Sequence, residues 1–234
     1  MRLHVGTSGY SYKEWKGPFY PEDLSAKDML SFYGTRLNAV EINNTFYRMP
    51  RESLLEGWAS QVPESFRFSV KASQKITHRK RLKDAGEETE YLVRTLRALG
   101  DRLGVLLFQL PPNLKKDLER LTGFLGSLPP ELPVAFEFRH DSWKDDDVVE
   151  ALRAHGAALC CADTEDDAED EPVVATASHG YLRLRRPDYS DDDLARWAQK
   201  VREQPWDRAF VFFKHEDAGA GPRMAHRFME KAGS

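Results

Sequence analysis

Short segments rich in β-forming residues alternate with longer amphipathic stretches along the whole chain. Eight segments have the length and the Val, Ile, Phe and Leu content that are typical of strands. They are Leu3–Thr7, Ala39–Asn43, Arg67–Lys71, Val105–Leu110, Val134–Arg139, Ala157–Asp163, Tyr181–Arg185 and Ala209–His215. Strands that alternate with helices form parallel sheets, because each return to the same end of the sheet needs a crossover. This alternation therefore predicts an α/β protein with a parallel sheet.

Apolar residues at helical spacing follow most of the predicted strands. The predicted helices are Asp28–Leu37, Glu88–Leu103, Lys116–Leu128, Asp191–Val201 and Pro222–Lys231. Eight strands in 234 residues favour one TIM-type (β/α)8 barrel with parallel strands, in which some helices are irregular or missing. A doubly wound open sheet is the rival fold, but the chain has neither a dinucleotide fingerprint nor a P-loop motif. We expect residues 1–234 to form a single domain.

Charge and composition narrow the class of protein. The net charge of −4 excludes the strongly basic balance of a dedicated nucleic-acid-binding protein, but it does not exclude a local basic groove. No stretch has the length and hydropathy of a membrane span, and the start of the chain lacks the apolar stretch of a signal peptide. Cys160 and Cys161 are adjacent, and neighbours on a strand point to opposite faces, which predicts free thiols. Free thiols fit the reducing cytoplasm, where we expect the protein.

Charged residues alternate with apolar residues on four of the predicted strands. Side chains alternate between the two faces of a strand, and in a barrel one face meets the helices while the other fills the interior. Because the apolar residues suit the helix layer, the alternate residues are predicted to point inward. The inward set is Glu41, Asn43, Arg67, Ser69, Lys71, Ala135, Glu137, Arg139, Tyr181, Arg183 and Arg185. Barrel interiors usually contain branched apolar side chains, so this charged set indicates a site.

The inward charges have two interpretations. They could satisfy one another in a salt-bridge lattice, for example Glu137 with Lys71 or Arg139. They could instead hold a polar ligand at the carboxyl ends of the strands, where the sites of TIM barrels lie. Positive charge is in excess, and arginine binds carboxylate and phosphate groups through paired hydrogen bonds. The excess therefore predicts a small anionic ligand that bears phosphate or carboxylate.

Residues at and just beyond the strand ends have side chains that could act in catalysis or bind a ligand. The predicted catalytic residues, which would transfer protons, are Glu41, His78, Glu137 and His140. The predicted ligand-binding residues are Asn43, Tyr47, Lys71, Arg81, Arg139, Trp143, Asp163, Arg183, Arg185, Lys214 and His215. Acidic and histidine side chains from several strands could converge on a metal ion. We predict no metal site, because no local metal-binding motif is present and the neighbouring Lys and Arg oppose a divalent cation. The sequence does not identify a cofactor, which stays unknown at this point.

Several motifs occur in an order that points to a known family. They are Gly6-Thr7-Ser8-Gly9-Tyr10-Ser11-Tyr12, Val40-Glu41-Ile42-Asn43-Asn44-Thr45-Phe46-Tyr47-Arg48, Lys71-Ala72, Ile76-Thr77-His78, Gln109-Leu110-Pro111-Pro112 and Glu137-Phe138-Arg139-His140 with Ser142-Trp143. Over nearly the whole chain they resemble the YecE-like family, known as domain of unknown function 72. The resemblance implies a TIM barrel and adds Gln109 to the ligand-binding residues. It implies no particular reaction.

Three classes of function fit these residues. The first is an enzyme, such as a hydrolase or a lyase, that acts on an anionic substrate in a polar pocket at the strand ends. The second is a nucleic-acid-binding or nucleic-acid-processing protein, by analogy with metal-dependent barrel endonucleases. The third is a protein that binds a ligand without turnover. We expect the first, because the acidic net charge and the missing metal motif both weigh against the second.

Overall fold

Eight parallel strands form a closed barrel in a computed structural model that describes residues 1–163, 173–214 and 217–233. The strands are β1 (Arg2–Ser8), β2 (Ala39–Ile42), β3 (Arg67–Lys71), β4 (Leu103–Gln109), β5 (Val134–Glu137), β6 (Ala158–Asp163), β7 (His179–Leu184) and β8 (Arg208–Phe213). Each strand pairs with its neighbours in the sequence, and β8 pairs with β1 to close the ring. The predicted parallel (β/α)8 barrel is confirmed, and the bounds of β3 are those predicted.

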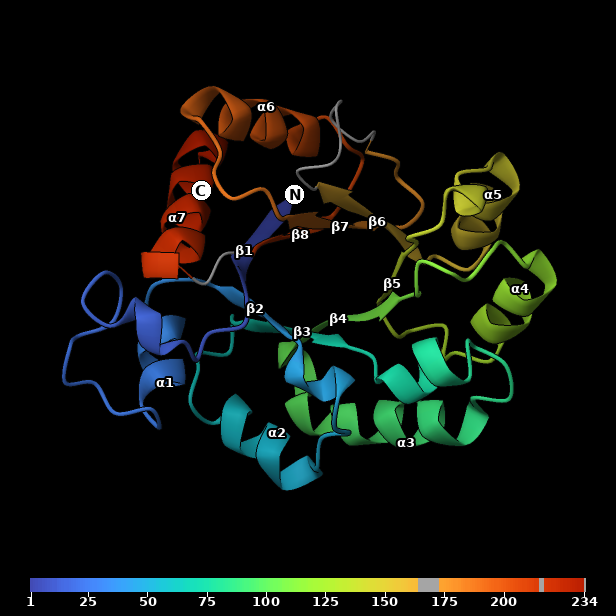
Figure 1. The fold of residues 1–234 in the computed structure, drawn as a ribbon, viewed down its shortest axis with the longest axis horizontal. Coiled ribbons are helices and arrows are strands. Elements are labelled where there is room, and N and C mark those ends of the chain that lie inside the picture. Colours follow the sequence, from blue (N-terminus) through green and yellow to red (C-terminus); the bar gives the residue numbers. More distant parts are fainter. Residues whose placement is uncertain (164–172, 215–216, 234) are drawn as a thin grey trace.

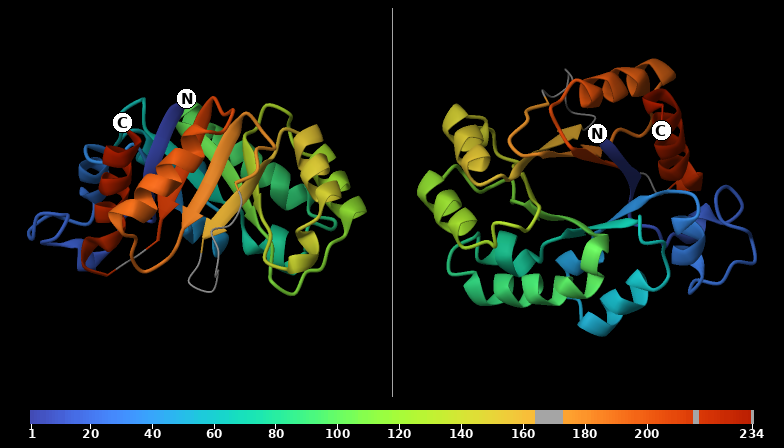
Figure 2. Two further views of the ribbon diagram at one scale, coloured as in Figure 1. Left: turned by 90° about the horizontal axis from the view of Figure 1, so that it is seen from above. Right: turned by 180° about the vertical axis from the view of Figure 1, so that it is seen from behind.

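Helices surround the strands in chain order (Figure 1), and both chain ends lie at the end of the barrel where the strands begin (Figure 2). The α-helices within the described residues are α1 (Met29–Gly34), α2 (Glu52–Ala59), α3 (Gly86–Leu96), α4 (Leu118–Gly126), α5 (Asp146–Ala154), α6 (Asp191–Arg202) and α7 (Ala220–Ala232). Helices α2 and α5 are absent from the sequence prediction. Each is short and buries only two hydrophobic residues, so the apolar period is weak.

Short helical turns occupy several of the connections that follow strands. They are η1 (Lys13–Trp15), η2 (Asn44–Phe46), η3 (Lys75–Arg79), η4 (Arg97–Arg102), η5 (Asp141–Trp143) and η6 (Asp217–Gly219). The turn η3 is a π-helix, whereas the other five are 3-10 helices. Turns η2, η3 and η5 follow β2, β3 and β5, so they lie at the carboxyl end of the barrel, where the candidate site is described below.

Apolar side chains form two separate cores, one on each side of the strand layer. The outer core lies between strands and helices and includes Val40, Val70 and Phe136. The inner core fills the barrel and includes Ala39, Ala135, Tyr181 and Phe210. The predicted division of side chains between the two faces is therefore confirmed. Because the inner core is small, polar side chains occupy the space towards the two ends of the barrel.

Arg67 is an exception within the predicted inward set. It is the first residue of β3 and pairs with Ala39, the first residue of β2, so it lies at the amino end of the barrel. Its Nη1 donates to the carbonyl oxygens of Glu64 and Phe66 at 2.7 and 2.9 Å. Arg67 and Lys71 share a strand face, yet they lie at opposite ends of the strand. Arg67 therefore takes no part in a site at the carboxyl end.

Strands β1 and β2 come unusually close beside Gly6. A Cβ atom at this position would lie 1.8 Å from the carbonyl oxygen of Ala39. The buried Tyr33 hydroxyl fills the space next to it, where it donates to Ala39 O and accepts from the Thr7 amide, both at 2.9 Å. Only glycine allows this approach.

The two cysteines lie as their adjacency predicts. Cys160 belongs to the inner core and Cys161 to the outer core, and both are buried free thiols. Opposite faces of one strand keep the two sulfur atoms from pairing. In the part of the chain that the structure describes, no helix has both the length and the hydropathy needed to cross a bilayer.

Candidate functional site

A buried arginine joins two carboxylates across the carboxyl end of the barrel. Arg183 of β7 donates from Nη2 to Glu41 Oε1 of β2 at 2.8 Å, and from Nη1 to Glu137 Oε2 of β5. All three side chains are buried. An ionised group in such a position is costly unless it is paired, and each member of this triad is paired with an opposite charge.

Glu41 accepts three further hydrogen bonds. Ser8 Oγ and Asn43 Nδ2 donate to Oε1 at 2.8 and 3.1 Å, and the Tyr181 hydroxyl donates to Oε2 at 2.8 Å. Burial alone would raise the pKa of Glu41, but the charge of Arg183 and the hydrogen bonds from Arg183, Tyr181 and Ser8 lower it from 4.5 to about 2. Glu41 is therefore a fixed carboxylate at neutral pH.

Glu137 is surrounded by positive charge. Its Oε1 lies 2.5 Å from Arg139 Nε, 3.6 Å from Arg185 Nη1 and 3.5 Å from Gln109 Nε2. Burial would raise the pKa of Glu137, yet the charges of Arg183, Arg139 and Arg185 lower it. The predicted ion pair between Glu137 and Arg139 is thus present.

Lys71 lies near these ion pairs without a carboxylate of its own. Across residues 1–163, 173–214 and 217–233, no hydrogen bond or ion pair reaches its Nζ, which instead lies 4.3 Å from the centre of the Phe46 ring. Burial and then the charge of Arg183 lower the pKa of Lys71 from 10.5 to about 8, although the two glutamates partly oppose this. An amine with this pKa exchanges protons readily near neutral pH.

His78 reaches the same aromatic ring. Its imidazole packs against the Phe46 ring nearly at right angles, with the ring centres 4.8 Å apart. The Thr77 hydroxyl lies 2.9 Å from His78 Nδ1 and fixes the orientation of the imidazole. Burial, and then the charges of Lys71 and Arg81, lower the pKa of His78. His78 therefore carries little positive charge at neutral pH.

The connection that carries His78 has an unusual backbone. The π-helix η3 contains this residue, and π-helical turns are often found at functional sites. Arg81 and Leu82 follow it with φ angles of 52° and 66°, a conformation that L-residues rarely adopt. Strained backbone of this kind is also frequent at active sites.

Positive charge exceeds negative charge in the cluster. The carboxylates are Glu41 and Glu137, and the cations are Lys71, Arg139, Arg183 and Arg185. Asn43 Oδ1, which is buried, has no hydrogen-bond partner among the described residues. The arrangement therefore contains two more cations than carboxylates, together with one buried acceptor that lacks a partner among the described residues. We call these six charged side chains the charged cluster.

Asp163 does not belong to the charged cluster. Ala162 of β6 lies opposite Arg183 of β7, so the next residue, Asp163, faces the other side of the strand layer. There it accepts hydrogen bonds from the Tyr189 hydroxyl at 2.7 Å and from Arg186 Nε at 2.9 Å. The prediction that Asp163 points inward with the other charged residues is therefore wrong.

Trp143 and His140 have structural contacts. Trp143 is 3% exposed, stacks on Phe138 at 4.6 Å, and donates from Nε1 to Leu114 O at 2.7 Å. His140 Nδ1 accepts from the Ser142 amide at 3.1 Å and so caps η5. Trp143 thus packs within the protein and does not offer its ring to a ligand, because η5 turns it towards the outer core.

Tyr47, Arg81 and Lys214 are the remaining predicted ligand-binding residues that the structure describes. Tyr47 is 75% exposed, and its ring contacts the Phe46 ring. Arg81 Nη2 donates to Asn113 Oδ1 at 3.4 Å. Lys214 is exposed, and His215 lies outside the described residues.

Sequence reasoning missed three partners of these groups. Ser8 is a hydrogen-bond donor to Glu41, Phe46 lies under the Lys71 ammonium, and Arg186 binds Asp163. Extending the face alternation to β1 would have placed Ser8 inward. In the structure Ser8 pairs with Glu41, which also points inward. No comparable signal exists for Phe46, which lies in a turn.

The described residues offer no obvious metal site. No group of three or more His, Cys, Asp and Glu side chains within residues 1–163, 173–214 and 217–233 is arranged to hold a metal ion. Glu41 and Glu137 both bind Arg183, and Asp163 binds Arg186. These carboxylates therefore already have cationic partners.

The fold and the charged cluster define a class of protein. It is a closed parallel TIM-type barrel that gathers ionised side chains at the carboxyl ends of its strands. The family model described as "Protein of unknown function DUF72" matches residues 4–234, and the chain belongs to this family. The resemblance that the sequence motifs indicated is thus confirmed.

Relatives of the chain cover almost its whole length. The UPF0759 protein YecE of Escherichia coli (strain K12) is 26% identical, over 97% of this chain and 92% of YecE. The UPF0759 protein YunF of Bacillus subtilis (strain 168) is 26% identical, over 93% of this chain and 90% of YunF. The crystal structure of a DUF72 family protein from Thermotoga maritima is 28% identical, covers all of both chains and superposes with a TM-score of 0.88.

Proposed function

We propose that the protein is an enzyme that acts on a small anionic substrate bearing phosphate or carboxylate. The observation that carries the proposal is the charge balance of the charged cluster. Within the charged cluster, the two carboxylates of Glu41 and Glu137 face four cations, Lys71, Arg139, Arg183 and Arg185. Arginine and lysine bind anionic groups through charge-assisted hydrogen bonds. Their place at the carboxyl ends of the strands is where TIM-barrel active sites lie.

In the proposal, each of these side chains has its own role in binding or proton transfer. Arg139 and Arg185 bind the anionic group, and Lys71 transfers protons, because an amine whose pKa is about 8 serves as acid and base near neutral pH. His78 is a second proton carrier, since its lowered pKa leaves it neutral. The glutamates suit this role less well than we expected from the sequence. Their lowered pKa values make them weak bases, so in the proposal they hold Arg183 in place.

Anion binding is the first test. The dissociation constant of inorganic phosphate would be measured by titration calorimetry for the natural protein and for Arg185→Ala. We expect binding to weaken at least about tenfold in this variant, since a hydrogen bond to a charged group contributes about 1.5–3 kcal/mol. Arg97→Ala is the matched control, because Arg97 is an exposed arginine on η4. Equal affinity in all three proteins would remove Arg185 from the proposal.

Turnover is the second test. The protein would be incubated with a panel of phosphate- and carboxylate-bearing small molecules, with thermal-shift detection of binding and mass-spectrometric detection of products. Turnover that disappears in Lys71→Met supports the enzyme. Binding without any product would instead favour a ligand-binding protein. Binding of an oligonucleotide that weakens steeply with added salt would favour the nucleic-acid alternative.

A further inference from the structure

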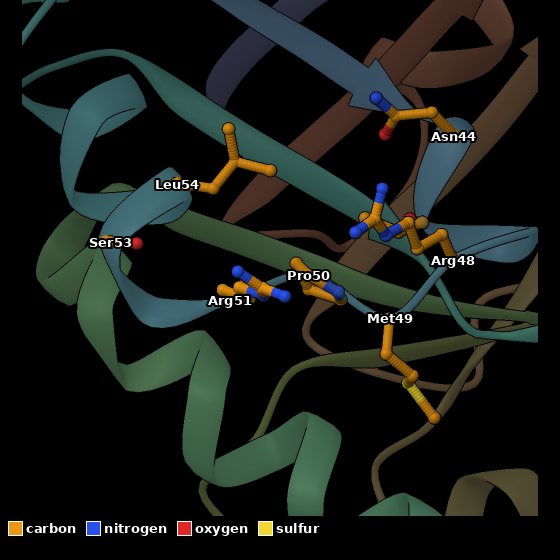
Figure 3. A pocket seen from close by; sticks show the side chains of 8 residues that line it. Asn44, Arg48, Met49, Pro50, Arg51, Ser53 and Leu54 are labelled. Carbon is orange, nitrogen blue, oxygen red and sulfur yellow. The ribbon is translucent and has the colours of Figure 1, made fainter.

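A groove of about 490 Å³ opens on the connection between β2 and α2 (Figure 3). Its lining residues are Asn44, Thr45, Arg48, Met49, Pro50, Arg51, Ser53 and Leu54. This lining includes two arginines and three apolar side chains, and it includes no acidic residue. The volume lies within the range of roughly 300–1,000 Å³ that is usual for small-molecule sites.

The groove lies next to residues of the charged cluster. Thr45, which lines the groove, donates from its hydroxyl to Lys71 O at 2.8 Å. The neighbouring Asn43 donates to Glu41, and the neighbouring Phe46 lies under the Lys71 ammonium. The short segment 43–46 therefore contributes residues both to the surroundings of the charged cluster and to the lining of the groove.

The two arginines of the groove are available to a ligand. Arg48 and Arg51 are exposed, and within the residues that the structure describes neither guanidinium has an ion pair or a hydrogen bond. Figure 3 shows both guanidinium groups in the groove, with Pro50 seen between them. A guanidinium plane without a partner stacks well on an aromatic ring.

Apolar surface gathers at the same place. Leu54 lines the groove and is 46% exposed, and Tyr47, which lies beside Arg48 in the chain, is 75% exposed. Tyr91, whose hydroxyl donates to Pro50 O at 3.2 Å, is a third exposed large hydrophobic residue. Exposed apolar side chains that cluster beside a polar site indicate a contact surface for a ligand.

We propose that the groove holds an aromatic ring of the substrate while the anionic group of the same molecule lies in the charged cluster. The substrate class is then an aryl or heteroaryl phosphate or carboxylate. This inference rests on the proposed function for the anionic group and adds the part of the substrate that the charged cluster does not bind. Arg48 and Arg51 stack on the ring, and Leu54 and Met49 cover its edges.

Matched pairs of small anions test the inference. Dissociation constants would be measured by calorimetry for methyl phosphate and phenyl phosphate, and for acetate and benzoate, at one pH and ionic strength. We expect the aromatic member of at least one pair to bind about tenfold more tightly. In the double variant Arg48→Ala/Arg51→Ala this advantage should fall to about twofold, while the affinity for the small anion stays the same. Arg97→Ala should keep the full advantage.

The outcomes separate the two proposals. Binding of the small anions that requires Arg185, with no advantage for the ring, would overturn the groove and leave the proposed function standing. An aromatic advantage that survives the double variant would also overturn it, since the ring would then bind elsewhere. Failure of all four anions to bind would overturn both proposals. Both arginines are exposed, so unfolding of the double variant is not expected, and its melting temperature checks this.

Discussion

The substitution Lys71→Met should stabilise the folded protein at neutral pH. The pKa of Lys71 falls from 10.5 to about 8 on folding, which corresponds to about 3 kcal/mol of less favourable charging inside the protein. Methionine keeps most of the packing and has no charge to bury. It loses the contact between the ammonium and the Phe46 ring, which contributes about 0.5–1 kcal/mol. The expected net gain at pH 7 is about 2 kcal/mol.

The gain should depend on pH with a defined sign. Below the folded pKa of about 8, Lys71 is charged in both states, and the folded protein bears the full cost of the buried ammonium. Between pH 8 and 10.5 the folded protein has lost the proton while the unfolded chain keeps it, so the cost disappears as the pH rises. The advantage of Lys71→Met should therefore shrink to below about 1 kcal/mol at pH 10.

Urea unfolding at pH 7 and at pH 10 measures both effects. Lys75→Met is the matched control, because Lys75 is an exposed lysine four residues further along the chain. Its effect should stay within about 0.5 kcal/mol at both pH values. A destabilising Lys71→Met at pH 7, or a gain of the same size at pH 10, would refute the reasoning. The first result would mean that the ammonium has better partners than the Phe46 ring, and the second that the gain does not come from the buried charge.

Three further predictions concern stability. Arg183→Met leaves Glu41 and Glu137 buried without their shared partner, so the free energy of unfolding in urea should fall by about 3–5 kcal/mol; a loss below about 1 kcal/mol would contradict the triad. The lowered pKa of Glu41, about 2, means that its charge adds stability above pH 4.5 that is lost as the pH falls towards 2. The difference between the natural protein and Glu41→Gln should therefore shrink from pH 7 to pH 3, and a constant difference speaks against it. Gly6→Ala places a methyl group against a backbone carbonyl and should lower the melting temperature by several degrees. Gly123→Ala is the matched control, because Gly123 lies in open space on α4, and it should raise the free energy of unfolding by about 0.5–1 kcal/mol.

The face of each strand residue could be predicted where polar and apolar side chains contrast. Glu41 lies between Val40 and Ile42, so the alternation places its carboxylate in the barrel interior, and the structure agrees. The run Ala158–Asp163 has no such contrast, because alanine and cysteine suit either face. The side on which Asp163 lies depends on its pairing with β7, which the sequence does not display.

The depth of a residue along the barrel is harder to predict than its face. Alternation gives Arg67 and Lys71 the same face, but four steps of about 3.3 Å separate them, which is enough to reach opposite ends of the barrel. Residues beyond the strand ends are harder still. Whether a turn residue such as Trp143 faces the core or the solvent depends on the packing of η5, and local spacing carries no record of that packing.

The bridge formed by Arg183 makes three distant segments of the chain interdependent. Strands β2, β5 and β7 are not neighbours in the ring. The Arg183 guanidinium of β7 nevertheless pairs with Glu41 of β2 and with Glu137 of β5. Substitutions at these three positions should thus be strongly non-additive, because residues in one ionic network share their energetic consequences. We therefore expect evolutionary change at these three positions to exchange the three side chains together.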